Sequence, residues 1–134
     1  MKIDEMMTTR IASIDADRSV YDAIEKMVDR RIRSLLVKFS AKDSSDGVIT
    51  ARDVVFKVLA KGINPTGIKV SSIASRPIVC VDHKVALSEA AALMEKSHIA
   101  RLFVCEGETI IGVASLMDIM AGSLIMRARG ENVP

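Results

Sequence analysis

Two pairs of residues, each a hydroxyl followed by a carboxylate, have the clearest chemical potential. Thr50 precedes Asp53 by three positions, and Ser115 precedes Asp118 at the same spacing. If each pair opens a helix, free backbone N–H groups and the positive end of the helix dipole favour a phosphate there. The hydroxyl adds a donor, and the carboxylate one turn further can accept hydrogen bonds from both hydroxyls of a ribose. The pattern is therefore compatible with a nucleotide site.

The same spacing also has a purely structural interpretation. A Ser or Thr N-cap with an acidic residue at N3 is a short form of the capping box. Such a cap stabilises a helix start by about 1 kcal/mol without any ligand. Local spacing alone favours capping over binding, but one pair can perform both roles, so the two interpretations stay open at this point.

Two cysteines and two histidines are the candidates for metal ligation. The spacings Cys80-x-x-His83 and His98-x6-Cys105 match no common zinc pattern, and alternation along a strand would point neighbouring ligands to opposite faces. Two cysteines are also too few for a disulfide framework. We therefore expect Cys80 and Cys105 to be small buried hydrophobic residues, with no metal site. We also recognise no arrangement of nucleophile, base and orienting acid, which predicts that the chain is not an enzyme.

An internal repeat supplies the elements that position these residues. Shifting the sequence by 67 places aligns identical residues of the two halves, such as Ala23 with Ala90 and Leu35 with Leu102. Beyond Gly47 the shift becomes 65, because the loop of the first copy is longer. The predicted organisation is a first repeat over 1–62, a linker over 63–69, a second repeat over 70–129 and a tail over 130–134, with the longer loop at Ser40 to Asp46.

Each copy is predicted to have the order β-α-β-β-α. Ser19 provides an N-cap for the first helix with Asp22 three residues on, whereas Ala86 cannot cap the equivalent helix of the second copy. The predicted elements are extended pieces at Ile11–Ile14 and Ile78–Val81, helices after Ser19 and Ala86, strands at Arg33–Lys38, Gly47–Ile49, Arg101–Cys105 and Thr109–Ala114, and closing helices at Ala51–Lys61 and from Leu116 to about Arg129.

The expected fold class is α/β (α+β), with two repeats packed sheet to sheet around a pseudo-twofold axis and clefts between them. A half of ~65 residues could not bury its sheet and both helices well alone. Both closing helices carry apolar residues on two faces, more than one core-facing stripe requires. A second copy of the chain would cover the extra face in a homodimer; the alternative is that the opposite half covers it.

The repeated unit resembles a CBS domain, and the tandem pair resembles a Bateman module. The resemblance extends from Ile3 to about Met126. It is strongest in a Gly-x-x-Ser/Thr-x-x-Asp motif that occurs at the same point of both copies. The matching segments are Ile3-Asp4-Glu5-Met6-Met7-Thr8, Ile32-Arg33-Ser34-Leu35-Leu36-Val37, Gly47-Val48-Ile49-Thr50-Ala51-Arg52-Asp53 and Gly112-Val113-Ala114-Ser115-Leu116-Met117-Asp118.

This resemblance implies that adenosine-containing ligands bind in clefts between the repeats and regulate an associated protein. The implied ligands are AMP, ADP, ATP or S-adenosylmethionine, with Asp53 and Asp118 holding ribose and Thr50 and Ser115 holding phosphate or sugar. The implied phosphate contact in the opposite repeat's site is Arg101 for Thr50 and Asp53, and Arg33 for Ser115 and Asp118. The residues implied to line the adenine slot or add contacts are Thr8, Ile11 and Arg10 in the first copy, and Ser75, Ile78 and Arg76 in the second.

These implied roles have simpler alternatives. Any single arginine can be a solvated surface charge, and Ile11 and Ile78 can equally be core residues. Arg10 stands where the second copy has Pro77, so the two slots differ. The rival interpretation of the whole chain is a ligand-free assembly module of the same fold.

Composition bounds the function further. The chain has 134 residues, of which 49% are hydrophobic, and 19 basic against 17 acidic residues leave a net charge of +2. A non-specific nucleic-acid binder would show a basic stripe with stacking aromatics, which this sequence lacks. No apolar run approaches the ~18 residues of a membrane span, and the acidic start is unlike a signal peptide. We expect a cytoplasmic sensor that acts on a partner protein.

Overall fold

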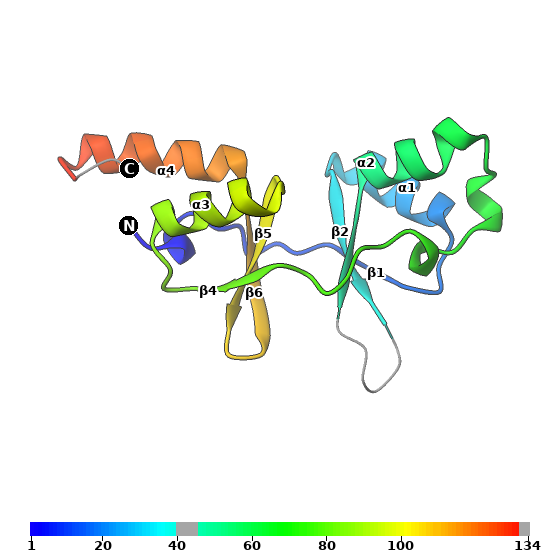
Figure 1. Ribbon diagram of the computed structural model, residues 1–134, viewed down its shortest axis with the longest axis horizontal. Coiled ribbons are helices and arrows are strands. Elements are labelled where there is room, and N and C mark those ends of the chain that lie inside the picture. Colours follow the sequence, from blue (N-terminus) through cyan, green and yellow to red (C-terminus); the bar gives the residue numbers. More distant parts are fainter. Residues whose placement is uncertain (40–45, 132–134) are drawn as a thin grey trace. The chain divides into compact units, whose positions relative to one another are not determined.

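The structure is a computed structural model that describes residues 1–39 and 46–131. The chain forms two compact units, shown in Figure 1. Unit 1 combines Met1–Ile11 with Val79–Pro134, and unit 2 consists of Ala12–Ile78. The predicted tail at 130–134 and loop at 40–46 fall mostly on residues 132–134 and 40–45, outside the described residues.

Unit 2 is a three-stranded sheet with two helices on one face. Strand β1 (Ser13–Asp15) pairs in parallel with β2 (Ser34–Lys38), which pairs antiparallel with β3 (Gly47–Thr50). The core cluster contains Leu35 and Val37 of β2 and Ile49 of β3, together with side chains from both helices. These helices are α1 (Val20–Arg30) and α2 (Ala51–Lys57), and three-residue 3₁₀ turns follow at Leu59–Lys61, Pro65–Gly67 and Val70–Ser72.

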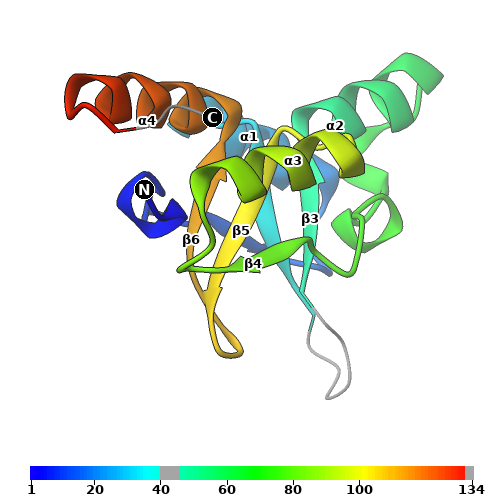
Figure 2. The same ribbon diagram turned by 60° about the vertical axis from the view of Figure 1, so that its left-hand side comes forward.

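Unit 1 repeats this plan, as Figure 2 shows from another side. Strand β4 (Cys80–Asp82) is parallel to β5 (Arg101–Glu106), and β5 is antiparallel to β6 (Thr109–Ser115). Leu102 and Val104 of β5 pack against α3 (Leu87–Ser97) and α4 (Leu116–Ala128), which share the core cluster. The predicted order β-α-β-β-α and the mixed α/β class are thus confirmed in both copies. Within the described residues, no helix is long and apolar enough to cross a membrane.

Each repeat begins with a leading segment, residues 1–11 in the first copy and 68–78 in the second. Each leading segment belongs to the compact unit that holds most of the other copy. Ile3, in a 3₁₀ turn at Ile3–Glu5, is fully buried in the core of unit 1, and its counterpart Val70 is fully buried in the core of unit 2. Backbone hydrogen bonds join Ile3 N–H to the carbonyl of Val85 at 2.8 Å and Val70 N–H to that of Arg18 at 2.8 Å. The compact units therefore differ from the predicted division into 1–62 and 70–129, because each core incorporates the leading apolar residue of the other copy.

The first closing helix is shorter than predicted. We expected it over Ala51–Lys61, but α2 ends at Lys57 because the backbone of Val58 leaves the helical region, with φ −121° and ψ −65°. This change places the Val58 side chain fully in the core, and the chain continues as a 3₁₀ turn. Gly62 then ends the segment in the left-handed conformation, with φ 69°, which glycine adopts without a steric penalty. In α1, Val20, Ala23 and Met27 are buried, whereas Val28 is 68% exposed.

The two first helices make a matched pair for measuring the N-cap. Ser19 Oγ accepts a hydrogen bond from Asp22 N–H at 3.1 Å, whereas Ala86 has the same extended backbone but no capping side chain. We expect Ser19→Ala to lower the free energy of unfolding by about 1 kcal/mol and Ala86→Ser to raise it by a similar amount. Denaturant unfolding of both variants measures this, and a loss from Ala86→Ser would contradict the capping argument.

An ion-paired cluster fastens the start of the chain to unit 1. The Asp4 carboxylate accepts hydrogen bonds from Lys84 Nζ at 3.0 Å and His83 Nδ1 at 3.1 Å. The hydrogen bond from Lys84 is the main cause that lowers the pKa of Asp4, with a further contribution from His83, and Asp4 in turn raises the pKa of Lys84. The cluster therefore makes the stability of unit 1 depend on pH.

The lowered pKa of Asp4 and the raised pKa of Lys84 determine how the stability changes with pH. Ionised Asp4 stabilises the fold above the ordinary aspartate pKa of about 3.9, and the stabilisation is lost as the pH falls through the lower folded value. The stabilisation contributed by protonated Lys84 is lost only as the pH rises through its folded-state pKa, which lies above the ordinary lysine pKa of about 10.4. We expect the difference in Tm between the unmodified chain and Asp4→Asn to stay constant around neutral pH and to shrink below about pH 4. A difference in Tm that stays the same at every pH would contradict this interpretation. Asp17→Asn, at an exposed aspartate, serves as the control.

Candidate functional site

Each hydroxyl–carboxylate pair lies where a strand runs into a helix. Thr50 is the last residue of β3 and the N-cap of α2, and Ser115 is the last residue of β6 and the N-cap of α4. All four side chains of the pairs are half-buried. The predicted position at helix starts is confirmed, and both pairs form complete capping boxes.

In the first pair, both carboxylate oxygens already have protein partners. Asp53 N–H donates to Thr50 Oγ1 at 3.0 Å, and Thr50 N–H donates to Asp53 Oδ2 at 3.0 Å. The second oxygen, Oδ1, lies 3.1 Å from Lys57 Nζ. Lys57 also donates to the carbonyl of Ile73 at 3.2 Å. A ribose hydroxyl would therefore compete with an ammonium group for Asp53.

In the second pair, the contacts gather on a single oxygen. Asp118 Oδ2 accepts from Ser115 N–H at 2.8 Å and from Ser115 Oγ at 3.0 Å, while Asp118 N–H donates to Ser115 Oγ at 3.3 Å. Among the residues that the structure describes, none donates a hydrogen bond to Asp118 Oδ1. Helix α4 is also longer than α2, with 13 residues against 7. The second pair thus keeps an open acceptor at the start of a full helix.

The two predicted phosphate-binding arginines begin the middle strand of their units. Arg101 opens β5, and its Cα is paired in register with that of Ser115. Arg33 directly precedes β2, and its carbonyl accepts from Ala51 N–H at 2.9 Å. Arg33 is exposed and Arg101 is half-buried. The backbone thus brings each arginine beside the pair of its own unit, while its assignment to the site of the opposite repeat stays a prediction.

Each leading segment lies beside the hydroxyl–carboxylate pair of the other copy, not beside that of its own copy. Thr8 forms an antiparallel bridge with Val113 of β6, and Ser75 forms the equivalent bridge with Val48 of β3. The structure therefore brings Thr8 to the unit of Ser115, and Ser75 to the unit of Thr50. The sequence reasoning placed each leading segment with its own repeat in the chain. Glycine at 112 and 47 leaves room for the close approach of these segments, because a Cβ would stand 3.0 Å from the carbonyl oxygen of Thr8 at Gly112 and 2.8 Å from that of Ser75 at Gly47.

The remaining predicted residues occupy the ends of these segments. Ile11 and Ile78 are half-buried and are the last residues before the chain passes from one unit to the other. Arg10 is exposed, and its N–H lies 3.4 Å from Thr8 Oγ1. Arg76 is also exposed and stacks its guanidinium over the ring of Phe39, 4.1 Å from the centroid. Sequence reasoning missed this Phe39 contact and the role of Lys57, although the i,i+4 spacing of Asp53 and Lys57 signals an ion pair.

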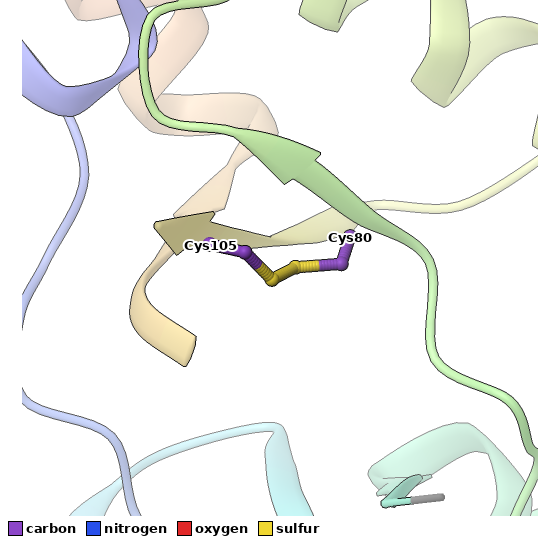
Figure 3. The surroundings of a disulfide bond; sticks show 2 residues. All are labelled: Cys80 and Cys105. Carbon is purple, nitrogen blue, oxygen red and sulfur yellow. A yellow bond between two sulfur atoms is a disulfide. The ribbon is translucent and has the colours of Figure 1, made fainter. Parts of the chain in front are cut away.

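The expectation for the cysteines was wrong. Cys80 of β4 and Cys105 of β5 form a disulfide with a Cα–Cα distance of 6.2 Å, shown in Figure 3. The parallel register pairs Cys80 with Phe103, so Cys105 lies two residues further along the neighbouring strand on the same face. That adjacency depends on strand register, which the spacing of 25 residues does not reveal. Within the described residues, no three His, Cys, Asp or Glu side chains gather as metal ligands would.

Two hollows of about 330 Å³ each lie on unit 2, apart from its hydroxyl–carboxylate pair. One is lined by residues of β1 and β2 and by Lys69 and Ser71, and the other by β1, Arg18, Asp22 and Lys26. Neither includes Thr50 or Asp53. The candidate site therefore rests on the hydrogen-bonding geometry of the two pairs.

Comparison with known proteins identifies both repeats. The family model described as CBS domain matches residues 3–60 and again residues 70–124. An uncharacterized protein of Methanopyrus kandleri is 34% identical over 96 residues, which are 71% of this chain and 48% of the relative. The inosine-5'-monophosphate dehydrogenase of Methanocaldococcus jannaschii is 31% identical over 120 residues, which are 89% of this chain and 23% of that enzyme.

Solved structures share the fold over nearly the whole chain. The hexameric CBS-CP12 protein from bloom-forming cyanobacteria has a TM-score of 0.87 at 29% identity, covering 95% of this chain and 74% of that one. A protein with CBS domains from Burkholderia ambifaria has a TM-score of 0.83 at 23% identity, covering 93% of this chain and 95% of that one, and this likeness concerns the fold alone. The chain spans about half the length of the first curated relatives it matches, 48% and 58%.

Proposed function

The chain belongs to the CBS domain family, and on that premise we propose that it is a regulatory module that binds adenosine-containing ligands and transmits the bound state to a partner protein. The ligand class is AMP, ADP, ATP or S-adenosylmethionine, and the role is regulatory rather than catalytic. The observation that carries the proposal is the open oxygen of Asp118 beside the Ser115 cap at the start of α4.

The geometry of the second pair suits a ribose. Asp118 is held by two contacts on Oδ2, so its orientation is fixed before a ligand arrives, and Oδ1 can accept a hydrogen bond from a ribose hydroxyl. A charged acceptor makes stronger hydrogen bonds than a neutral one. The helix start favours negative charge from a phosphate nearby. These features support ribose and phosphate recognition in addition to capping.

A ligand can transmit its presence only through differential binding. It shifts the arrangement of the chain, or of an assembly of chains, by as much free energy as it gains in one arrangement over another. An adenosine compound that engages Asp118 also restrains the start of α4. The partner protein would then recognise the restrained state, which is the regulatory step of the proposal.

Ligand titration with a thermal readout tests the proposal. We expect at least one of AMP, ADP, ATP and S-adenosylmethionine to stabilise the chain by about 2.7 kcal/mol at 100 times its Kd. Adenosine compared with 2′,3′-dideoxyadenosine isolates the ribose hydroxyls, and only adenosine should bind. If Arg33 or Arg101 contacts phosphate, its replacement by alanine should weaken the binding of ATP more than the binding of adenosine. Absence of any shift with all four compounds would rule the sensor role out.

The ion pair of Lys57 with Asp53 predicts unequal sites. Replacing Lys57 by methionine removes the competitor at Asp53 Oδ1 and keeps the aliphatic stem, so the first pair should gain affinity. We expect the affinity of the weaker of two binding events in a calorimetric titration to rise by up to about fivefold, the scale of an exposed ion pair. Lys61→Met, at an exposed lysine of the same segment, should change nothing. Equal effects of the two variants would contradict this interpretation.

An assembly function is the second candidate, favoured by exposed apolar side chains on both closing helices. On α4, Leu124 is 72% and Met117 is 68% exposed, and Phe56 of α2 is 55% exposed. Monomeric proteins rarely leave such patches uncovered. We propose that a second copy covers them in a homodimer, with or without ligand. Sedimentation of Leu124→Glu tests this: the variant should be monomeric where the unmodified chain is dimeric.

A further inference from the structure

The disulfide joins β4 and β5 of unit 1, whereas the equivalent strands β1 and β2 of unit 2 have no disulfide between them. At the repeat shift of 67, Cys80 corresponds to Ser13 and Cys105 to Lys38. Both strand pairs have the same parallel register, because Asp82 is paired with Cys105 and Asp15 with Lys38. Strands β1 and β2 therefore pair without a covalent bond. Unit 2 thus forms the equivalent sheet with the same register and no disulfide between these strands.

The disulfide lies outside the core cluster of unit 1. Cys105 alternates along β5 with Leu102 and Val104, which face the core, so its side chain points to the other face of the sheet. Both cysteines are half-buried rather than enclosed. The register of β5 with β6 shifts between Val104 and Cys105, so the ladder is irregular at the bonded residue. A disulfide exchanges with external thiols more readily the less it is enclosed by the protein.

We propose that Cys80 and Cys105 form a reversible redox site, and that reduction by a dithiol loosens β4 from the sheet of unit 1. One thiolate of the dithiol attacks a sulfur of the bond, forming a mixed disulfide and releasing the other cysteine as a thiolate. The second thiolate of the reductant then attacks the mixed disulfide, which releases the second cysteine and leaves the reductant as a cyclic disulfide. Two electrons pass from the dithiol to the cysteine pair, and its two protons end on the cysteine sulfurs.

Strand β4 is the element that responds. It has three residues, and on either side of it Phe103 N–H donates to the carbonyl of Val79 at 3.1 Å and His83 N–H donates to that of Cys105 at 2.9 Å. The bond closes a loop of 25 positions that contains the whole of α3. Opening such a loop restores much chain entropy to the unfolded state, so the reduced unit is less stable and β4 opens more often.

The test follows thiol content and local opening in the unmodified chain. Protein equilibrated in dithiothreitol buffers of graded oxidation is alkylated for counting of free thiols by mass spectrometry, and matched samples are used for thermal unfolding and hydrogen exchange. We expect full, reversible conversion, a Tm lower by on the order of 10 °C in the reduced form, and faster exchange at 79–83. The equivalent segment of unit 2, 12–16, should exchange at the same rate in both forms.

A cysteine variant and three outcomes decide the proposal. Cys105→Ser should give one Tm in reducing and oxidising buffer alike; if it fails to fold, the titration of the unmodified chain still decides. A bond that excess dithiothreitol leaves intact in the folded protein would overturn the proposal, since the disulfide would be permanent. Thiols that stay free in oxidising buffer would also overturn it, as would equal Tm and exchange in the two forms.

Discussion

Asp118→Asn is expected to weaken the binding of adenosine-containing ligands by roughly ten- to a hundredfold, the loss of a hydrogen bond to a charged group. Asparagine keeps an oxygen that can accept from Ser115 N–H, as Asp118 Oδ2 does at 2.8 Å, so the cap survives. It replaces the open acceptor Oδ1 by an NH₂ donor, which cannot accept the ribose hydroxyls. Isothermal titration calorimetry with the ligand that stabilises the unmodified chain measures the loss.

Asp53→Asn is the matched control. Because Lys57 already occupies Asp53 Oδ1, this substitution should change ligand affinity much less than Asp118→Asn does. Both variants lose one negative charge at a helix start, which costs about 0.3–1 kcal/mol of stability in each case. Equal losses of stability with unchanged affinity in Asp118→Asn would mean that the second pair only caps α4, and the sensor role would lose its main support.

Local sequence signals predicted the elements because they act within a few residues. Ser19 marks the start of α1 through a hydroxyl that bonds three residues ahead, and the Thr50 and Ser115 caps follow the same rule. Repetition of the same signals 65 or 67 positions later gave the order of strands and helices in each copy. These features depend on spacing along the chain, which a single sequence displays.

Long-range register was not visible in the same way. The disulfide depends on which residue of β5 stands beside Cys80. The open oxygen of Asp118 depends on whether a cation contacts it as Lys57 contacts Asp53, and no residue that the structure describes does so. The exchange of leading segments was missed for the same reason, since Ile3 and Val70 fill cores formed mainly by residues far away in the sequence. Contacts of this kind are decided by packing, and apolar residue types alone do not specify partners.

Gly47→Ala is the second large effect, and it tests the exchanged packing directly. A Cβ at Gly47 would stand 2.8 Å from the carbonyl oxygen of Ser75 and 3.2 Å from the Phe39 ring. That carbonyl accepts from Val48 N–H at 2.9 Å, so it cannot move without weakening the bridge that holds the leading segment on β3. We expect a loss of about 1–3 kcal/mol in the free energy of unfolding, as for other overpacked sites.

Gly67→Ala separates this contact from the general effect of removing a glycine. A Cβ at Gly67 has no neighbour within 4 Å, and neither glycine has a positive φ, so alanine suits both backbones. Alanine at 67 should be neutral or slightly stabilising, because it restricts the unfolded chain. Denaturant unfolding of the two variants gives the comparison. If both behave alike, the Ser75 segment does not lie against β3, and the grouping of Ser75 with Thr50 and Asp53 fails with it.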